Sequence, residues 1–180
     1  MKTKPNAQNL LSRRWMQQAL IGMLETKTLG EINISQLAQR AGVSRMTFYR
    51  NYSAINDVIF DYLRMEEFGL AGDKDAYLYL PRFIKCMYEF FKRNQTLFSC
   101  IEENGLVPNL YVILDDFISL RSYLLVDAYG FESRYERSAL SGLFSKIRLD
   151  WFSSGMKESV EEMCFTVFKI ITKFNCTLQS

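Results

Sequence analysis

Residues 33–52 read NISQLAQRAGVSRMTFYRNY, and this stretch predicts a helix, a tight turn and a second helix. Asn33 can cap the first helix, with Gln36 at the third helical position, which is the spacing of a capping box. Gly42 supplies the left-handed backbone that commonly ends a helix, and Ser44 can cap the next one. The pattern therefore indicates a helix-turn-helix of the kind that enters DNA.

The charge around this stretch is one-sided. No acidic residue lies between Glu31 and Asp57, whereas Arg40, Arg45 and Arg50 do. A surface that approaches phosphates needs such an excess of positive charge. The side chains that we expect to contact DNA are Asn33, Arg40, Ser44, Arg45, Met46, Thr47, Tyr49 and Arg50.

The charge of the whole chain follows the same division. The 180 residues carry a formal net charge of only +2. Residues 1–64 hold nine Lys and Arg against four Asp and Glu, whereas residues 65–180 hold thirteen against sixteen. A basic N-terminal part on a mildly acidic remainder is the asymmetry expected when one end binds DNA and the other does something else.

The residue types present restrict the chemistry. There is no histidine, which removes the commonest general base and metal ligand. The four cysteines have no CxxC spacing, so we expect no zinc site, no cofactor and reduced thiols in a cytoplasmic protein. No signal peptide or membrane-spanning run is seen. An enzyme with Cys86 or Cys100 as nucleophile is a competing class, but it would lack a histidine to activate the thiol.

The periodicity predicts an all-α chain of about nine helices, because strand-like alternation is nearly absent. We assign residues 1–53 to the helix-turn-helix domain, residues 54–68 to a connecting helix and residues 69–180 to a regulatory and dimerisation domain. The other helices are expected at about 6–26, up to 93, 94–105, 108–129, 132–154 and 159–175. Pro81 starts or kinks the helix that ends at Arg93.

The last two predicted helices are apolar on two sides, so each must be covered on two sides. Their own domain can cover one side, and a second copy of the chain can cover the other in a four-helix interface. The alternative is a central buried helix in a monomer. The residues that we expect at a dimer interface are Ser138, Gly142, Ser145, Leu149, Phe152, Val160, Cys164, Phe168 and Ile171.

Residues 19–59, through the pattern L-A-x-x-A-G-V-S-x-x-T-F-Y-x-x-Y, resemble the N-terminal domain of the TetR family of bacterial transcriptional regulators. Residues 141–163, SGLFSKIRLDWFSSGMKESVEEM, resemble the subgroup that includes regulators of dihydroxyacetone kinase operons. The resemblance implies a homodimer that binds a palindromic double-stranded DNA operator. It also implies control by a small-molecule or protein effector at the C-terminal domain. A repressor is the first expectation.

The resemblance also implies roles for single residues. The second helix of the motif would lie in the major groove, with Tyr49 on a phosphate and with Arg45 and Thr47 on base edges or phosphates. Local packing is the alternative for Thr47 and Tyr49, and a solvated charge is the alternative for Arg40. Two departures are Met46, where many members have Gly, and Ile55, where many have Lys. The free amides that start the connecting helix could still bind phosphate there.

Several alternatives remain open. The protein could be an activator, or a helix-turn-helix repurposed for contact with a partner protein. The middle of the chain is rich in aromatic residues, which at helical spacing are usually core. A ligand pocket is the minority interpretation, and its candidate lining is Phe83, Met87, Phe91, Phe117 and Arg121.

Overall fold

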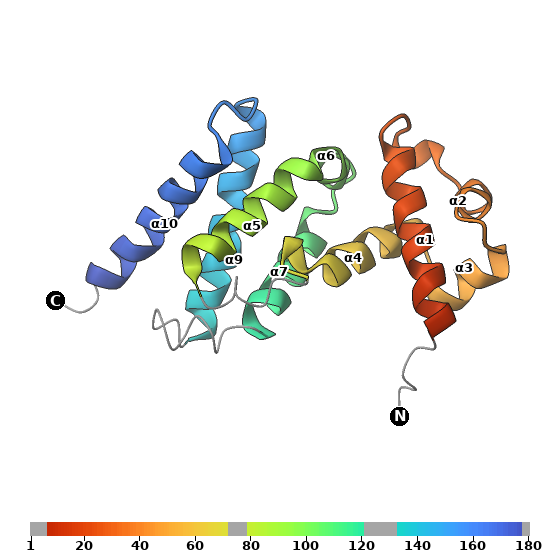
Figure 1. Ribbon diagram of the computed structural model, residues 1–180, viewed down its shortest axis with the longest axis horizontal. Helices are drawn as coiled ribbons and strands as arrows, with labels where there is room; N and C mark the ends of the chain where they lie inside the picture. Colours follow the sequence, from red (N-terminus) through yellow and green to blue (C-terminus); the bar gives the residue numbers. More distant parts are fainter. Residues whose placement is uncertain (1–6, 72–78, 121–132, 178–180) are drawn as a thin grey trace. The chain divides into compact units, whose positions relative to one another are not determined.

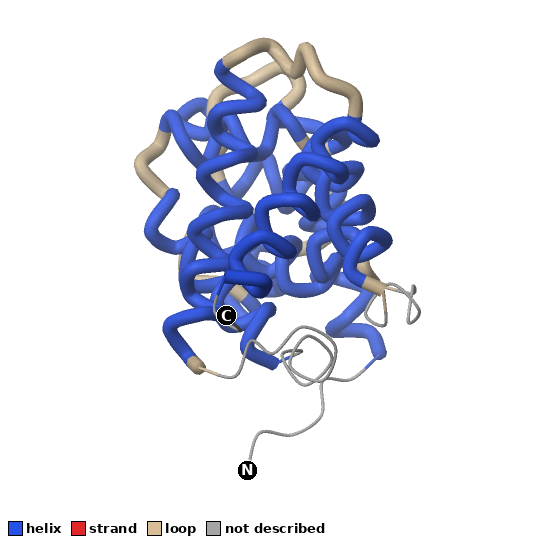
Figure 2. Tube along the Cα trace, turned by 90° about the vertical axis from the view of Figure 1, so that its left-hand side faces the viewer, coloured by secondary structure: helices blue, strands red, loops and turns tan. Residues whose placement is uncertain are grey.

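The computed structural model describes residues 7–71, 79–120 and 133–177, and these residues form helices and loops only (Figures 1 and 2). The prediction of an all-α fold is confirmed. The α-helices of the described residues are α1 (Ala7–Leu24), α2 (Ile34–Arg40), α3 (Arg45–Asn51), α4 (Ile55–Glu66), α5 (Leu80–Arg93), α6 (Gln95–Glu103), α7 (Val107–Leu120), α9 (Arg134–Ser153) and α10 (Val160–Thr177). Two short 3-10 helices are η1 (Leu29–Glu31) and η2 (Glu67–Gly69).

The chain forms two compact units. The first, here called the head, contains Met1–Met65 and Thr96–Leu106, and the second, the body, contains Glu66–Gln95 and Val107–Ser180. The first segment of the head therefore ends at Met65, in the last turn of α4. It also includes α6, which comes from the middle of the sequence, where we had placed only the regulatory domain.

The head is built on α1, which packs against α2 and α3 (Figure 1). Met16 and Leu20 of α1, Leu37 of α2 and Phe48 of α3 are each at most 1 % exposed. Burial of such side chains contributes about 1.5–3 kcal/mol each. Leu10, in the first turn of α1, is 37 % exposed.

The predicted caps of the helix-turn-helix are confirmed. The Asn33 side chain accepts a hydrogen bond from the Gln36 amide at 3.0 Å, and the Gln36 side chain accepts one from the Asn33 amide. The Ser44 hydroxyl accepts a hydrogen bond from the Thr47 amide at 3.1 Å. Gly42 adopts a φ of 68°, which a residue with a Cβ rarely adopts. These local features fix where both helices begin and where the first one ends.

The body has an aromatic core, and within it α5 packs against α10 and α7 against α9. Phe68 contacts the rings of Phe90, Phe91 and Phe117 at centroid distances of 5.2–6.4 Å. Such edge and tilted contacts add to the free energy of burial. The core of the body is therefore held largely by ring packing between η2, α5 and α7.

Helix boundaries in the body follow local signals. Pro81 lies in the first turn of α5, where its missing amide hydrogen is not needed. Ser159 and Glu162 form a capping box at the start of α10, which agrees with the helix start predicted at residue 159. A second capping box, Ser133 with Glu136, starts α9 and was not predicted. The predicted end of the helix near Tyr129 lies outside the described residues.

Candidate nucleic-acid interface

The helix α3, the second helix of the helix-turn-helix, presents one exposed face. Phe48 is fully buried and anchors the helix, whereas Met46 is 77 % exposed and Tyr49 is 50 % exposed. Arg45 and Arg50 are also exposed. Because residues three and four positions apart are neighbours on a helix surface, the pairs Arg45–Tyr49, Met46–Tyr49 and Met46–Arg50 join these four exposed side chains into a single surface. We call Arg45, Met46, Tyr49 and Arg50 the α3 face.

Two other side chains predicted to contact DNA, Ser44 and Asn33, already make hydrogen bonds within the chain. The Ser44 hydroxyl caps α3 and lies 3.0 Å from the Thr47 hydroxyl, which is half-buried. The Asn33 side chain is exposed but caps α2. The two caps fix the residues at which α2 and α3 begin, and the cap of α3 thereby helps to position the α3 face. The Tyr49 ring packs edge-on against Phe48 at 5.6 Å, so this tyrosine is exposed and anchored at the same time.

Arg40 lies beside α1 and apart from the α3 face. Its Nη2 atom is 3.6 Å from the position that a Cβ on Gly22 would occupy. It lines a shallow surface groove together with Trp15, Gln18 and Ala19 of α1. Trp15 is 46 % exposed, which is high for a tryptophan, and sequence reasoning did not single it out.

The start of α4 differs from the expectation that its amides are free for phosphate. The Asp57 carboxylate accepts hydrogen bonds from the amides of Ser53 and Ala54 at 2.8 and 2.9 Å. These two donors are therefore satisfied by an acid of the chain. That carboxylate also places negative charge at the helix start, which opposes an approaching phosphate.

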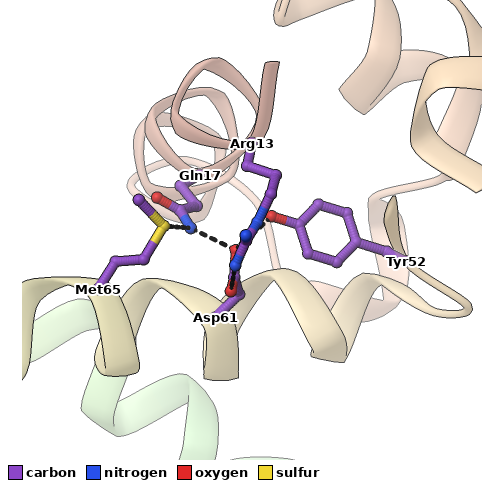
Figure 3. Close-up of polar contacts among 5 residues, drawn as sticks. All are labelled: Arg13, Gln17, Tyr52, Asp61 and Met65. Carbon is purple, nitrogen blue, oxygen red and sulfur yellow. Dashed lines mark hydrogen bonds and ion pairs between the residues drawn. The ribbon is translucent and has the colours of Figure 1, made fainter. Parts of the chain in front are cut away.

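A buried polar cluster joins α1, α4 and the end of α3 (Figure 3). The Asp61 carboxylate accepts hydrogen bonds from Tyr52 Oη at 2.6 Å, Gln17 Nε2 at 2.7 Å and Arg13 Nε at 2.9 Å. Arg13 also forms an ion pair with Asp61 through Nη2. We call Arg13, Gln17, Tyr52 and Asp61 the Asp61 cluster.

The protonation states of the Asp61 cluster follow from its contacts. The hydrogen bond to Asp61 raises the pKa of Arg13, so the guanidinium stays charged. Burial, and then the hydrogen bond to Asp61, raises the pKa of Tyr52, so its hydroxyl stays protonated and donates. Because Asp61 pairs with Arg13, this arginine is not a free positive charge on the surface of α1.

Sequence reasoning missed this cluster, although a signal was present. Arg13 and Gln17 are four residues apart on α1, so they share a helix face, and Gln17 continues the buried row to Leu20 and Leu24. Asp61 lies three residues after Val58 and two before Leu63, both fully buried. A polar residue on a buried helix face requires a hydrogen-bond partner. The signal in the sequence is that α1 and α4 each carry a polar residue, Gln17 and Asp61, within an otherwise apolar row.

The structure divides the predicted dimer residues into two sets. Ser145, Val160 and Ile171 are at most 7 % exposed within a single chain, so they belong to the body's own core. Cys164 interacts electrostatically with Lys85, Glu89 and Cys86, which places it on the side of α10 that meets α5. The remaining residues are partly or fully exposed: Ser138, Gly142, Leu149, Phe152 and Phe168. We call these five residues the outer face of α9 and α10.

The predicted pocket residues are core residues. Phe83, Met87, Phe91 and Phe117 are at most 6 % exposed, and the rings of Phe83 and Phe117 stack at 6.1 Å. Arg121 lies outside the described residues. Two buried hydroxyls nearby, those of Tyr88 and Ser145, have no hydrogen-bond partner among the described residues. Burial is the main cause that raises the pKa of Tyr88.

The same core holds a buried cation. Arg148 is 0 % exposed, and its guanidinium lies 5.9 Å from the ring centroid of Phe91 and 5.3 Å from that of Phe152. A cation over a ring face is stabilised by the ring quadrupole. The centre of the body therefore contains hydrogen-bonding groups among its aromatic rings.

The described residues give little sign of a nucleophilic cysteine, a metal site or a membrane span. Burial raises the pKa of the Cys100 thiol, and it raises that of Cys164 to about 11, whereas a nucleophilic cysteine needs a lowered pKa. The described residues contain no group of three side chains that could hold a metal ion. Within the same residues, none of the helices has the length and apolarity that a membrane span requires.

Comparison with known proteins gives one informative likeness. No protein-family model matches the chain, and no curated protein matches it by sequence. The fold is similar to that of a solved structure, the dihydroxyacetone kinase operon activator DhaS, with a TM-score of 0.65 and 12 % sequence identity. The match covers 93 % of this chain and 98 % of that chain. At this identity the likeness shows a shared fold.

Proposed function

We propose that this protein is a DNA-binding transcriptional regulator of the TetR type that binds a pseudo-palindromic operator as a homodimer. The observation that carries the proposal is the α3 face. It is an exposed surface with two arginines, on a capped helix-turn-helix that has no acid between Glu31 and Asp57. The fold likeness to an operon activator supports the same class.

Each residue of the α3 face suits contact with a different part of DNA. Arg45 begins the recognition helix, and an arginine there suits a bidentate contact to a guanine edge. Tyr49 is half exposed and suits a hydrogen bond to a phosphate. Met46 is the most exposed apolar side chain in the head and suits a thymine methyl or a sugar. We assign Arg40 to a supporting role, because its guanidinium lies beside α1.

The proposal is tested by selecting a preferred duplex from a random library and measuring its affinity against a scrambled duplex. Arg45→Ala should lose about 1–3 kcal/mol of binding free energy on the selected duplex and relax specificity at one base pair. Tyr49→Phe should weaken binding to both duplexes to a similar degree, because it removes one hydrogen bond to a phosphate. Arg14→Ala, which removes an exposed charge from α1, is the matched control and should act only through salt dependence. A wild-type protein that selects no sequence contradicts the proposed function.

We propose the outer face of α9 and α10 as the dimer interface. It combines Gly142, which permits close backbone approach, with partly exposed Leu149, Phe152 and Phe168. Phe165 on α10 is 68 % exposed and extends the apolar area. A two-fold dimer would cover this surface and would present two recognition helices to half-sites roughly 34–36 Å apart.

We further propose that an effector controls DNA binding through the body. The unpartnered hydroxyls of Tyr88 and Ser145 support this, because buried polar groups without partners are uncommon and often mark function. Such an effector changes operator affinity only if it prefers one arrangement of the protein, typically by about 1–3 kcal/mol, and the effect is reciprocal. Operator affinity that is the same in cell extract and in pure buffer would argue against control of this kind.

The sign of regulation is a separate question. We favoured a repressor from the sequence resemblance, whereas the structural neighbour is named as an operon activator. A reporter gene placed behind the selected operator distinguishes the two, since deletion of the regulator raises or lowers its expression. A helix-turn-helix used only for protein contact is the second alternative, and it predicts no mobility shift with any duplex.

A further inference from the structure

The Asp61 cluster connects three elements of the head through one carboxylate. Asp61 lies in α4, Arg13 and Gln17 lie in α1, and Tyr52 is the C-cap residue of α3. Figure 3 shows the three partners converging on Asp61 from two sides, with Gln17 also reaching Met65 Sδ at 3.1 Å. The end of the recognition helix is therefore tied to both α1 and α4.

These contacts are shielded from water. Gln17 is 3 % exposed and Tyr52 is 6 % exposed, while the side chains of Asp61 and Arg13 are 13 % and 25 % exposed. Hydrogen bonds to a charged group are about twice as strong as neutral ones, and low exposure limits competition from water. The cluster can therefore hold its elements at a fixed distance and angle.

The recognition helix has few other anchors. It spans only seven residues, and Phe48 is the one residue within it that is buried. Its orientation thus depends on the Phe48 ring, on the Ser44 cap at its start and on Tyr52 at its end. A loss of the Tyr52 hydroxyl bond would loosen that end, where the Tyr52 ring still packs on Phe48 at 5.7 Å, while leaving the α3 face chemically intact.

We propose that Asp61 is a positioning residue for DNA recognition, which holds α3 through Tyr52 in the orientation that a specific operator requires. The inference rests on the proposed function. It adds that specificity depends on a buried carboxylate that does not touch DNA. Base readout requires side chains placed to within fractions of an ångström, whereas phosphate attraction tolerates tilt. Loss of the cluster should therefore reduce specific binding more than non-specific binding.

The test compares Tyr52→Phe and Asp61→Asn with the wild type in the full-length protein. Tyr52→Phe removes a single oxygen, so it keeps the test valid even if Asp61→Asn folds poorly. The control is Met23→Ala, which removes a buried side chain from α1 outside the cluster and lowers stability by packing alone. All four proteins are measured well below their unfolding temperatures, on the selected duplex and on its scrambled counterpart at low salt.

We expect both cluster variants to bind the selected duplex about tenfold more weakly, with scrambled-duplex affinity changed less than about twofold. Met23→Ala should retain the wild-type ratio of the two affinities. An unchanged ratio in Tyr52→Phe and Asp61→Asn would overturn the inference, and so would parallel losses that match Met23→Ala. A wild-type protein that does not distinguish the duplexes would instead refute the proposed function itself.

Discussion

At the scale of single residues, the acids that flank the helix-turn-helix on its C-terminal side are bound within the head, whereas the arginines of α3 are not. Asp61 is engaged by three partners, and Asp57 is engaged by two backbone amides. Arg45 and Arg50 remain exposed on the α3 face. Because Asp57 and Asp61 are satisfied internally and no acid lies between Glu31 and Asp57, the positive charge of the α3 face is not cancelled by a neighbouring acid in the sequence.

Cys164 gives a prediction at this scale. Its folded pKa is about 11, chiefly because of burial and the nearby Glu161, whereas an unfolded thiol titrates near 8.5. The folded state therefore holds its proton more tightly. The stabilisation is complete below the unfolded pKa and is lost as pH rises towards 11. The free energy of unfolding, measured with denaturant, should thus fall more steeply between these pH values for the wild type than for Cys164→Ala. Equal slopes would contradict the assignment.

At the scale of elements, the connection after α4 is unusual. Glu67, Phe68 and Gly69 all have positive φ values, of 48°, 52° and 86°. Left-handed backbone costs about 1–2 kcal/mol for a residue with a Cβ. The complete burial of Phe68 among Phe90, Phe91 and Phe117 offsets this cost. The turn is therefore held by the aromatic core and not by its own preference.

Gly69→Ala tests this turn. A Cβ there would lie 2.8 Å from Phe90 Cβ and 2.9 Å from the Cys86 carbonyl oxygen, in addition to the cost of positive φ. We expect a loss of about 2–4 kcal/mol in the free energy of unfolding, measured with urea. Gly155→Ala is the matched control, since Gly155 has a φ of 81° but open space around a Cβ. It should lose only about 1 kcal/mol. Similar losses in both variants would mean that the steric contact is unimportant.

At the scale of the whole molecule, the outer face of α9 and α10 is the surface on which the proposed dimer depends. The single chain packs Ser145, Val160 and Ile171 inside, which leaves Gly142 and Phe168 towards solvent. A Cβ on Gly142 meets nothing within 4 Å in the single chain. A larger residue there can therefore disturb an assembly without disturbing the chain itself.

We expect the wild type to sediment as a dimer without DNA, and Gly142→Leu and Phe168→Glu to shift it towards the monomer. The first would separate backbones that approach closely, and the second would bury a charge at an apolar interface. Ala139→Leu, at an exposed position of α9 outside the outer face, is the matched control and should leave the dimer intact. A monomeric wild type, or two variants that stay dimeric, would rule out this interface.

The sequence by itself determined the features that depend on neighbours along the chain. The caps at Asn33, Ser44 and Ser159, the turn at Gly42 and the all-α class follow from local hydrogen bonds and periodicity. The helix α3 and its exposed arginines could be predicted for the same reason. The local pattern also showed that the last two helices are apolar on two sides.

Only the tertiary structure decided which groups distant in sequence meet. Arg13 and Asp61 form an ion pair although 48 positions separate them, and no local pattern specifies such a partner. The assignment of α6 to the head, and of Ser145 to the core instead of the outer face, also depends on packing between distant helices. Periodicity shows that a helix face is apolar, but it does not show which neighbour covers that face.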